Sequence, residues 1–533
     1  MTKPNKPIIW TISGSDCSGG AGIAADIKTG HVLGVEVCHL STANTIQNSQ
    51  ILLSVNPVKV EILAQQAQLL LNDKIPSVIK IGLLVNEEQV NWLADFLETL
   101  KQQYPQIKVV YDPVGHASVG GKFSNLSVTQ LKSLLKLVDV ITPNSKEAQW
   151  LVASSSIQVK SLAQEIMALG VKSVIIKGGH VLGEDIARIK CANIEVHTAC
   201  FDYCLHTLTD DDSSKMSEDE TIEYGLCSPK IDTHYSHGGG CSFASALASF
   251  IAHGHLVRDA FTLTKAFINQ GLSENVGKHD HYGAFTQTYW PTDKKSFPVV
   301  SSNINLKYQE LSAFQSLGLK QNTLNSNNTD NTSEQKLGLY PVIDSLYWLK
   351  RLLPLGLQII QLRIKNKTEA ELDAIIAEAV DLAKPYKTRL FINDYWQLAI
   401  KHGAYGVHIG QEDLQTTPIE QIHKAGIRLG ISTHGCYEFL LAQQLKPSYL
   451  AIGAIYPTKT KNMTGQIQGV ENLADILSLA TDIPVVAIGG INHERAPEVL
   501  ATGVDSIAVV TAITEAENPE ESVKLFQKLL GNT

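Results

Sequence analysis

The sequence lacks the features that mark several classes of protein. Its eight cysteines include no CxxC pair and no His/Cys cluster, so we expect reduced thiols in a cytoplasmic protein. The net charge is −9 without a basic block, which argues against nucleic acid as a partner. No apolar run is long enough for a membrane span or a signal region, so we expect no membrane partner. With 44% hydrophobic residues in 533, the composition is that of a globular protein of two or three domains.

A polar stretch divides the chain. Residues 291–337 contain NTLNSNNTDNTSEQK, which is typical of a solvated linker, so we expect domains at 1–290 and 338–533. In the second domain, eight short apolar runs alternate with helical stretches, which predicts a parallel (β/α)₈ TIM barrel. In the first, five such runs predict an open, mostly parallel α/β sheet. We expect residues 181–236 to be irregular, with an exposed acidic loop at TDDDSSKMSEDE.

Polar residues and glycines recur directly after the predicted barrel strands, where barrels of this kind hold their active sites. Two aspartates offer hard oxygen ligands for Mg²⁺, three cations suit a diphosphate, and two backbone turns suit a single phosphate. One such residue would be ordinary loop capping, but six sets at successive strand ends indicate a site. The sets include Asp394 and Asp413; Arg363, Lys365 and Lys461; and Gly489-Gly490 and Val510-Thr511.

The motifs QLRIK, FINDYWQLAIKHGAYGVHIGQEDL, GISTH, YPTKTK and VAIGGI resemble those of the thiamine-phosphate synthases over essentially the whole second domain. The resemblance implies that hydroxymethylpyrimidine diphosphate joins thiazole phosphate, with loss of pyrophosphate. Thr511 stands where serine is more usual, with little expected effect. The implied roles are Mg²⁺ binding by Asp394 and Asp413; pyrimidine-diphosphate binding by Gln361, Arg363, Lys365, Asn393, Ser432 and Lys461; and thiazole-phosphate binding by Thr458, Thr460, Gly490, Val510 and Thr511.

The run HYSHGGGCSFASAL, residues 234–247, places three glycines and a cysteine before a helical pattern. Glycines at a helix N-terminus let backbone N–H groups face an anion such as a phosphate. Cys241 then lies where such an anion, or a hydroxyl about to become one, would be, and a helix N-terminus lowers the pKa of a thiol. The alternative interpretation is a small buried cysteine that merely starts a helix.

Together with TISGSDCSGGAGIAADIKT, YDPV, ITPNSKEA and IIKGGH, this run resembles the hydroxymethylpyrimidine and hydroxymethylpyrimidine-phosphate kinases of the ribokinase-like group, over about residues 1–285. The resemblance implies phosphorylation by ATP and Mg²⁺ of a pyrimidine alcohol and its phosphate, with a cysteine as the base. The implied residues are Cys241, Gly238 and Gly240 for catalysis; Gly14, Asp26 and Gln47 for the pyrimidine; and Asp112, Asn144, Glu147 and Lys177 for the region of ATP and Mg²⁺.

The first half departs from that family at several positions. Gly239 replaces a threonine, Ser118 stands where a lysine is usual, and Asn44 and Ile46 are expected to alter the pocket wall. The product of the first half would be the substrate of the second, which favours one bifunctional enzyme of thiamine biosynthesis acting on small molecules. A synthase whose kinase-like half only binds pyrimidine remains the alternative, whereas Cys241 in place of aspartate argues against a sugar kinase. Both families imply a possible homo-oligomer.

Overall fold

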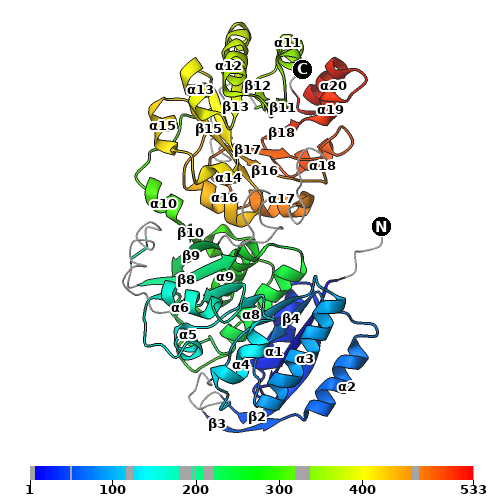
Figure 1. Cartoon of the computed structure of the whole chain (residues 1–533), viewed down its shortest axis with the longest axis vertical. Helices are drawn as coiled ribbons and strands as arrows, with labels where there is room; N and C mark the ends of the chain where they lie inside the picture. The colour runs from blue at the N-terminus through cyan, green and yellow to red at the C-terminus, as the bar shows by residue number, and fades with distance from the viewer. Residues whose placement is uncertain are drawn as a thin grey trace. The chain divides into compact units, whose positions relative to one another are not determined.

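The contacts of the computed structural model separate the chain into two compact units, Met1–Leu306 and Lys307–Thr533 (Figure 1). Each unit is built around a sheet of its own. No helix among the described residues is long and apolar enough to cross a bilayer. The described residues are 6–48, 51–115, 124–178, 194–195, 198–207, 221–317, 337–458 and 467–531.

The described residues of the first unit form a ten-stranded sheet with a parallel centre and antiparallel edges. All five predicted strands are present, and they read as continuous apolar runs because both of their faces are buried. In sheet order the strands are β10 (Val299–Ser301), β9 (Thr221–Pro229), β8 (Ala199–Thr207), β7 (Ser173–Ile176), β6 (Val140–Ile141), β5 (Lys108–Tyr111), β4 (Val78–Ile81), β1 (Ile8–Ser15), β2 (Glu36–Gln47) and β3 (Leu52–Pro57).

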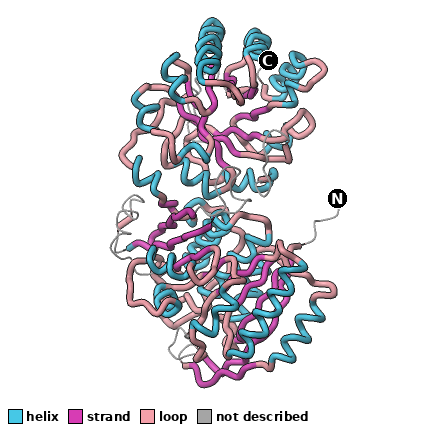
Figure 2. The backbone as a smooth tube through the Cα atoms, viewed as in Figure 1, coloured by secondary structure: helices cyan, strands magenta, loops and turns pink. Residues whose placement is uncertain are grey.

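Helices cover both faces of this sheet (Figure 2). One face carries α1 (Gly22–Val32), α8 (Gly239–Ala252) and α9 (Val257–Ser273), and the other carries α2 (Val60–Leu70), α3 (Glu87–Gln103), α4 (Val128–Leu135), α5 (Ser145–Leu151) and α6 (Val159–Met167). Strand β1 shows the division, because Trp10 and Ile12 pack in the core with α3 and α4, whereas Thr11 between them donates a hydrogen bond to Asp26 of α1. The first unit is therefore an open α/β sheet, as predicted, with helices on both of its faces.

The prediction that residues 181–236 are irregular is wrong for residues 199–207 and 221–229, which form strands. Strands β8 and β9 pair along their whole lengths as an antiparallel hairpin, and β10 adds to it. The sequence pattern hid β8 because polar residues such as Asp202 and His206 are buried in it, and because a strand rather than a helix follows it. The predicted acidic loop lies outside the described residues.

The described strands of the second unit close into a barrel of eight parallel strands in sequence order, as predicted. Tyr340, Phe391 and Tyr449 lie among the apolar residues of its interior, where aromatic rings meet edge to face. The strands are β11 (Leu339–Ile343), β12 (Ile359–Leu362), β13 (Arg389–Asn393), β14 (Gly406–Ile409), β15 (Arg428–Thr433), β16 (Tyr449–Ile452), β17 (Val485–Ile488) and β18 (Ser506–Val509).

Helices surround the barrel and place the following strand parallel to the previous one (Figure 1). Two helices begin directly at strand ends that carry predicted site residues. The helices are α11 (Leu346–Leu352), α12 (Glu369–Ala383), α13 (Trp396–His402), α14 (Gln411–Leu414), α15 (Ile419–Lys424), α16 (Cys436–Gln443), α17 (Gly469–Leu477), α18 (Ala496–Ala501), α19 (Thr511–Thr514) and α20 (Pro519–Leu529).

The predicted linker, residues 291–337, is more structured than its composition indicates. Strand β10 belongs to the sheet of the first unit, and α10 (Asn303–Tyr308) follows it. Beyond this helix, the backbone N–H of Phe314 donates to the carbonyl of Lys446, and Leu317 is buried in the barrel core. The linker prediction was based on the Asn-rich segment, and residues 318–336 of it lie outside the described residues.

Candidate active sites

A cavity of about 730 Å³ opens at the carboxyl ends of the central strands of the first unit. Open α/β sheets bind their ligands at this edge, because the loops after neighbouring parallel strands converge there. Nine of the ten site residues predicted for the first unit line this cavity: Gly14, Gln47, Asp112, Asn144, Glu147, Lys177, Gly238, Gly240 and Cys241.

Cys241 lies in the first turn of α8, directly after the glycine run. Gly238 is the N-cap residue with φ of 79°, and a Cβ there would lie 1.9 Å from the backbone oxygen of Gly20. Only glycine therefore lets the turn before α8 pack against the glycine-rich turn after β1. A Cβ on Gly239 would meet nothing within 4 Å, so close packing does not require glycine at this position, where the resembling kinases usually have threonine.

Cys241 is partly buried. Burial raises the pKa of the thiol to about 11, although the Lys80 charge and a hydrogen bond from the backbone N–H of Gly22 both oppose this rise. The prediction that the helix N-terminus lowers this pKa is therefore wrong in its net direction, because desolvation outweighs the favourable charge. The thiol is the favoured form of Cys241 at neutral pH.

An ion pair borders the glycine turn. Lys177 Nζ lies 2.7 Å from Asp112 Oδ1, and a Cβ on Gly240 would lie 3.5 Å from that nitrogen. Asn144 caps α5 and forms a capping box with Glu147. Burial raises the pKa of Glu147 to about 7, with Lys177 opposing the rise and Asp112 adding to it. Two carboxylates and an ammonium thus gather beside a helix N-terminus, an arrangement suited to nucleotide phosphates with a divalent cation.

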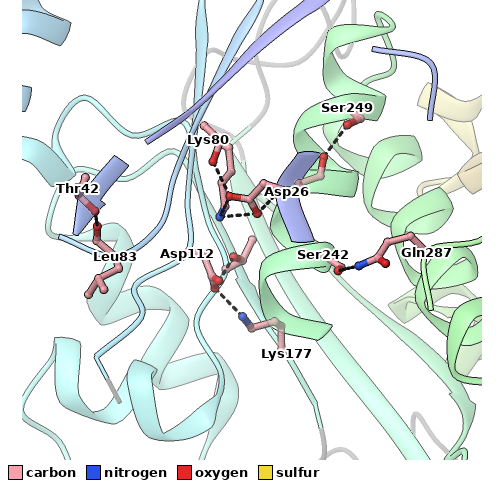
Figure 3. A network of polar contacts seen from close by, with 12 residues as sticks. Asp26, Thr42, Lys80, Leu83, Asp112, Lys177, Ser242, Ser249 and Gln287 are labelled. Carbon is pink, nitrogen blue, oxygen red and sulfur yellow. Dashed lines mark hydrogen bonds and ion pairs between the residues drawn. The ribbon is translucent and has the colours of Figure 1, made fainter. Parts of the chain in front are cut away.

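Asp26 does not line the cavity, although the resemblance placed it against the pyrimidine. Its carboxylate is fully buried between α1, β4 and α8 (Figure 3). Lys80 Nζ lies 2.9 and 2.8 Å from its two oxygens, and the hydroxyls of Thr11 and Ser245 also donate to it. Asp26 is therefore a member of a buried network behind the cavity.

Two cavity residues that the sequence reasoning missed form a hydrogen bond across the glycine-rich turns. His237 Nε2 lies 2.9 Å from Asp16 Oδ2, and the backbone N–H of Ala21 donates to the same carboxylate. Although burial opposes it, hydrogen bonds from His237 and Ser18 hold the pKa of Asp16 well below its usual value. An aspartate directly after the first strand, in SGSD, was the available signal.

Two expected departures in the pocket wall do not reach the cavity. Asn44 and Ile46 are exposed on β2, whereas Thr45 and Gln47, which alternate with them, line the cavity. The prediction that Asn44 and Ile46 alter the wall is therefore wrong. Ser118 lies outside the described residues.

In the second unit, the predicted residues lie at the carboxyl ends of the strands, which in a closed parallel barrel form one rim. Gln361 and Asn393 are buried in strands, whereas Lys365 is exposed beyond its strand. Thr460 and Lys461 lie outside the described residues. The remaining members are Arg363 directly after β12, Asp394 directly after β13, Asp413 in α14, Ser432 in β15, Thr458 after β16, Gly490 after β17, and Val510 and Thr511 after β18.

A buried chain of hydrogen bonds joins two of these residues, and the sequence reasoning missed its middle members. Gln361 Nε2 donates to the Tyr340 hydroxyl, which lies 2.7 Å from that of Tyr449. The Tyr449 oxygen lies 2.7 Å from His408 Nδ1, and His408 Nε2 lies 2.8 Å from Ser432 Oγ. Burial lowers the pKa of His408 to about 3, so its ring is neutral. A histidine inside the apolar run GVHI was the available signal.

The two predicted phosphate turns have different structures. Gly490 has φ of 63°, and a Cβ there would lie 2.6 Å from the carbonyl oxygen of Pro457, so the turn packs closely against the loop after β16. Arg495 Nη1 donates to the Gly490 carbonyl. Thr511 begins α19, with Val510 as its N-cap residue. Backbone N–H groups at such a position are suited to a phosphate.

Comparisons with known proteins match both halves. The sequence model of the phosphomethylpyrimidine kinase family matches residues 16–285, and that of the thiamine monophosphate synthase family matches residues 339–513. The thiamine-phosphate synthases of Yersinia pseudotuberculosis and Salmonella schwarzengrund are 56% and 58% identical over 187 and 181 residues. These matches cover 35% and 34% of this chain, and 87% and 86% of those proteins.

Solved structures similar to the chain come from both groups. Thiamine phosphate pyrophosphorylase from Pyrococcus furiosus is 33% identical over 37% of this chain and 96% of its own, with a TM-score of 0.34. A phosphomethylpyrimidine kinase from Clostridium difficile is 26% identical over 50% of this chain and 99% of its own, with a TM-score of 0.38. On its sequence matches, the chain belongs to the phosphomethylpyrimidine kinase family in its first half and to the thiamine-phosphate synthase family in its second, and is a bifunctional transferase of thiamine biosynthesis.

Proposed function

We propose that the residues of the two sites catalyse consecutive reactions. The first unit transfers phosphoryl groups from ATP to hydroxymethylpyrimidine and to its phosphate. The second unit joins the resulting diphosphate to thiazole phosphate and releases pyrophosphate. One observation supports the proposal most strongly: Cys241 and the backbone of Gly238–Gly240 share a single cavity with Gly14 and Gln47, the residues assigned to the pyrimidine.

In the first unit, the thiolate form of Cys241 takes the proton of the reacting hydroxyl while that oxygen attacks the transferring phosphorus. The backbone N–H groups at the start of α8 face the negative charge that develops on the phosphoryl oxygens. Lys177 adds a positive charge beside this turn, and Asp112 holds its ammonium in place. These contributions are positioning and electrostatic stabilisation, which carry most of the catalysis in phosphoryl transfer.

The residues present fit Mg²⁺ in both units. Among the described residues no three His, Cys, Asp or Glu side chains group as a metal cage, but Mg²⁺ at phosphates needs only one or two carboxylates. Glu147 and Asp112 supply these in the first unit, where burial and the neighbouring Asp112 raise the pKa of Glu147 while Lys177 opposes the rise. Asp394 and Asp413 supply them in the second. When bound, Mg²⁺ neutralises phosphate charge.

In the second unit, Arg363, Lys365 and Lys461 hold the diphosphate and offset its charge as it leaves. Gln361 and Ser432 orient the pyrimidine ring from two sides of the barrel. The buried chain through Tyr340, Tyr449 and His408 fixes both of these side chains. Backbone donors at Gly490, Val510 and Thr511 hold the thiazole phosphate. No general base is needed, because the thiazole nitrogen attacks with its lone pair.

The raised pKa of Cys241 favours a second candidate, in which the first unit binds the pyrimidine without turnover. The two candidates are distinguished by the release of ADP from ATP in the presence of hydroxymethylpyrimidine, compared between Cys241→Ala and the unaltered chain. The proposal predicts loss of ADP release by about 100-fold or more in the variant. Synthase activity of the same chain, measured with the pyrimidine diphosphate, is the internal control and stays unchanged. Equal ADP release by both proteins would contradict the proposed base.

We propose small molecules as the partners of both sites, with ATP and Mg²⁺ required by the first and Mg²⁺ by the second. Self-association remains a prediction, which light scattering on the full chain tests. A cytoplasmic location also remains a prediction, based on the composition of the sequence.

A further inference from the structure

Lys80 is a charged residue in the centre of the apolar strand β4, and its side chain is fully buried. Its ammonium makes two hydrogen bonds, both to Asp26, and among the described residues no other acceptor is recorded for it. Burying two charges is costly, and apolar residues of similar volume are often at least as stable in such a place. Packing alone therefore does not account for the Lys80–Asp26 pair.

The pair lies directly beneath the proposed active site. A Cβ on Gly82 would lie 3.0 Å from Lys80 Nζ and 2.3 Å from Ser13 Oγ, and Ser13 lines the cavity. On the other side, the Ser245 hydroxyl of α8 donates to Asp26 at 2.7 Å. Cys241 lies one helical turn before Ser245 and thus on the same face of α8. The face of α8 that carries Cys241 is therefore the face that is hydrogen-bonded, through Ser245 and Asp26, to the buried ammonium.

We propose that Lys80 is a positioning residue of the kinase half, whose buried positive charge, held by Asp26, stabilises the thiolate form of Cys241. The inference rests on the proposed role of Cys241 as the base. The thiol first loses its proton to water. The thiolate then takes the proton of the substrate hydroxyl, whose oxygen bonds to the γ-phosphorus while the bond to ADP breaks. Cys241 ends the step as a thiol.

Four charged groups face Cys241 from the elements around it. Lys80 of β4 and Lys177 after β7 favour the thiolate, whereas Asp26 of α1 and Asp112 after β5 oppose it. Lys177 already has Asp112 at 2.7 Å and borders Gly240, at the phosphate side of the turn. Lys80 instead lies beneath the cavity and is linked through Asp26 to the face of α8 that carries Cys241. Its influence on the pKa of Cys241 is larger than that of Asp26.

The test compares Lys80→Met with Asp26→Asn in the full chain. Iodoacetamide alkylates the thiolate form, so the midpoint of its pH dependence at Cys241, followed by peptide mass spectrometry, reports where the proton is lost. Exposed Cys17 in the same digest is the reference. Lys80→Met should move the Cys241 midpoint to higher pH by about one unit or more, and Asp26→Asn should move it to lower pH. The pH profile of the kinase reaction should move in the same directions.

If Lys80 and Asp26 had only a structural role, the two variants would not shift the Cys241 midpoint in opposite directions. Midpoints that stay in place, or that move in the same direction in both variants, would overturn the inference. If Lys80→Met does not fold, the downward shift in Asp26→Asn decides alone. Shifted midpoints together with full kinase turnover in Cys241→Ala would keep the role of Lys80 in thiolate formation and refute Cys241 as the base. Unshifted midpoints together with loss of kinase turnover in Cys241→Ala would refute the role of Lys80 in thiolate formation and keep Cys241 as the base.

Discussion

Replacing Gly238 by alanine tests whether the contact between the two glycine-rich turns shapes the kinase site. With φ of 79°, an alanine costs about 1–2 kcal/mol in backbone energy. Its Cβ would also lie 1.9 Å from the Gly20 oxygen, so the turns must separate by about 1 Å or more. A displacement of that size at reacting groups costs about 100-fold in rate, so we expect kinase kcat/KM to fall by about that factor.

The matched control is Gly254→Ala at the other end of α8. Gly254 has φ of 92°, but a Cβ there would meet nothing within 4 Å. It therefore shares the backbone cost without the clash, and we expect a lower Tm with kinase activity retained. A coupled ADP assay on both variants measures the difference, with synthase turnover as the reference for intact protein. Equal kinase activity in the two variants would refute the reasoning about the turns.

Three further predictions concern single side chains. Tyr449→Phe removes the hydroxyl between Tyr340 and His408, so it should lower barrel stability by about 1–3 kcal/mol in urea unfolding and reduce synthase but not kinase turnover. His408 has its pKa lowered from 6.5 to about 3, so the unfolded barrel binds the proton more readily; stability should fall by about 2 kcal/mol from pH 7 to pH 5, and His408→Gln should remove this dependence. Because the pKa of Glu147 is raised to about 7, the KM for Mg-ATP should rise as the pH falls below 7, and Glu147→Gln should raise it at every pH. If His408→Gln kept the pH dependence of barrel stability, or Glu147→Gln kept that of the KM for Mg-ATP, the result would count against the role given to that residue.

The barrel and its rim were predictable because local sequence carries the information. Each barrel strand is buried by the interior on one side and by helices on the other, so it reads as a short apolar run. Residues directly after such runs must lie on one rim once all strands are parallel. Their spacing after the apolar runs was enough to place Arg363, Asp394 and Gly490 at the rim of the barrel.

The buried polar residues were not predictable in the same way. The Asp26 side chain could face either the cavity or the Lys80 side chain, depending on the rotation of α1 against β4. Packing between distant segments of the chain decides this rotation. Strand β8 was missed because its polar residues are paired internally, with Lys265 Nζ 2.7 Å from Asp202. In each case a tertiary partner, absent from the local pattern, determines the position of a polar side chain.

The most direct test of the account is the formation of thiamine phosphate by the full chain from two alternative feeds. One feed supplies hydroxymethylpyrimidine phosphate, ATP, Mg²⁺ and thiazole phosphate, and the other supplies the pyrimidine diphosphate in place of the monophosphate and ATP. The account predicts product from both feeds with the unaltered chain, and from the second feed alone with Cys241→Ala. Product from the second feed alone with the unaltered chain would contradict it and leave the first unit as a pyrimidine-binding domain.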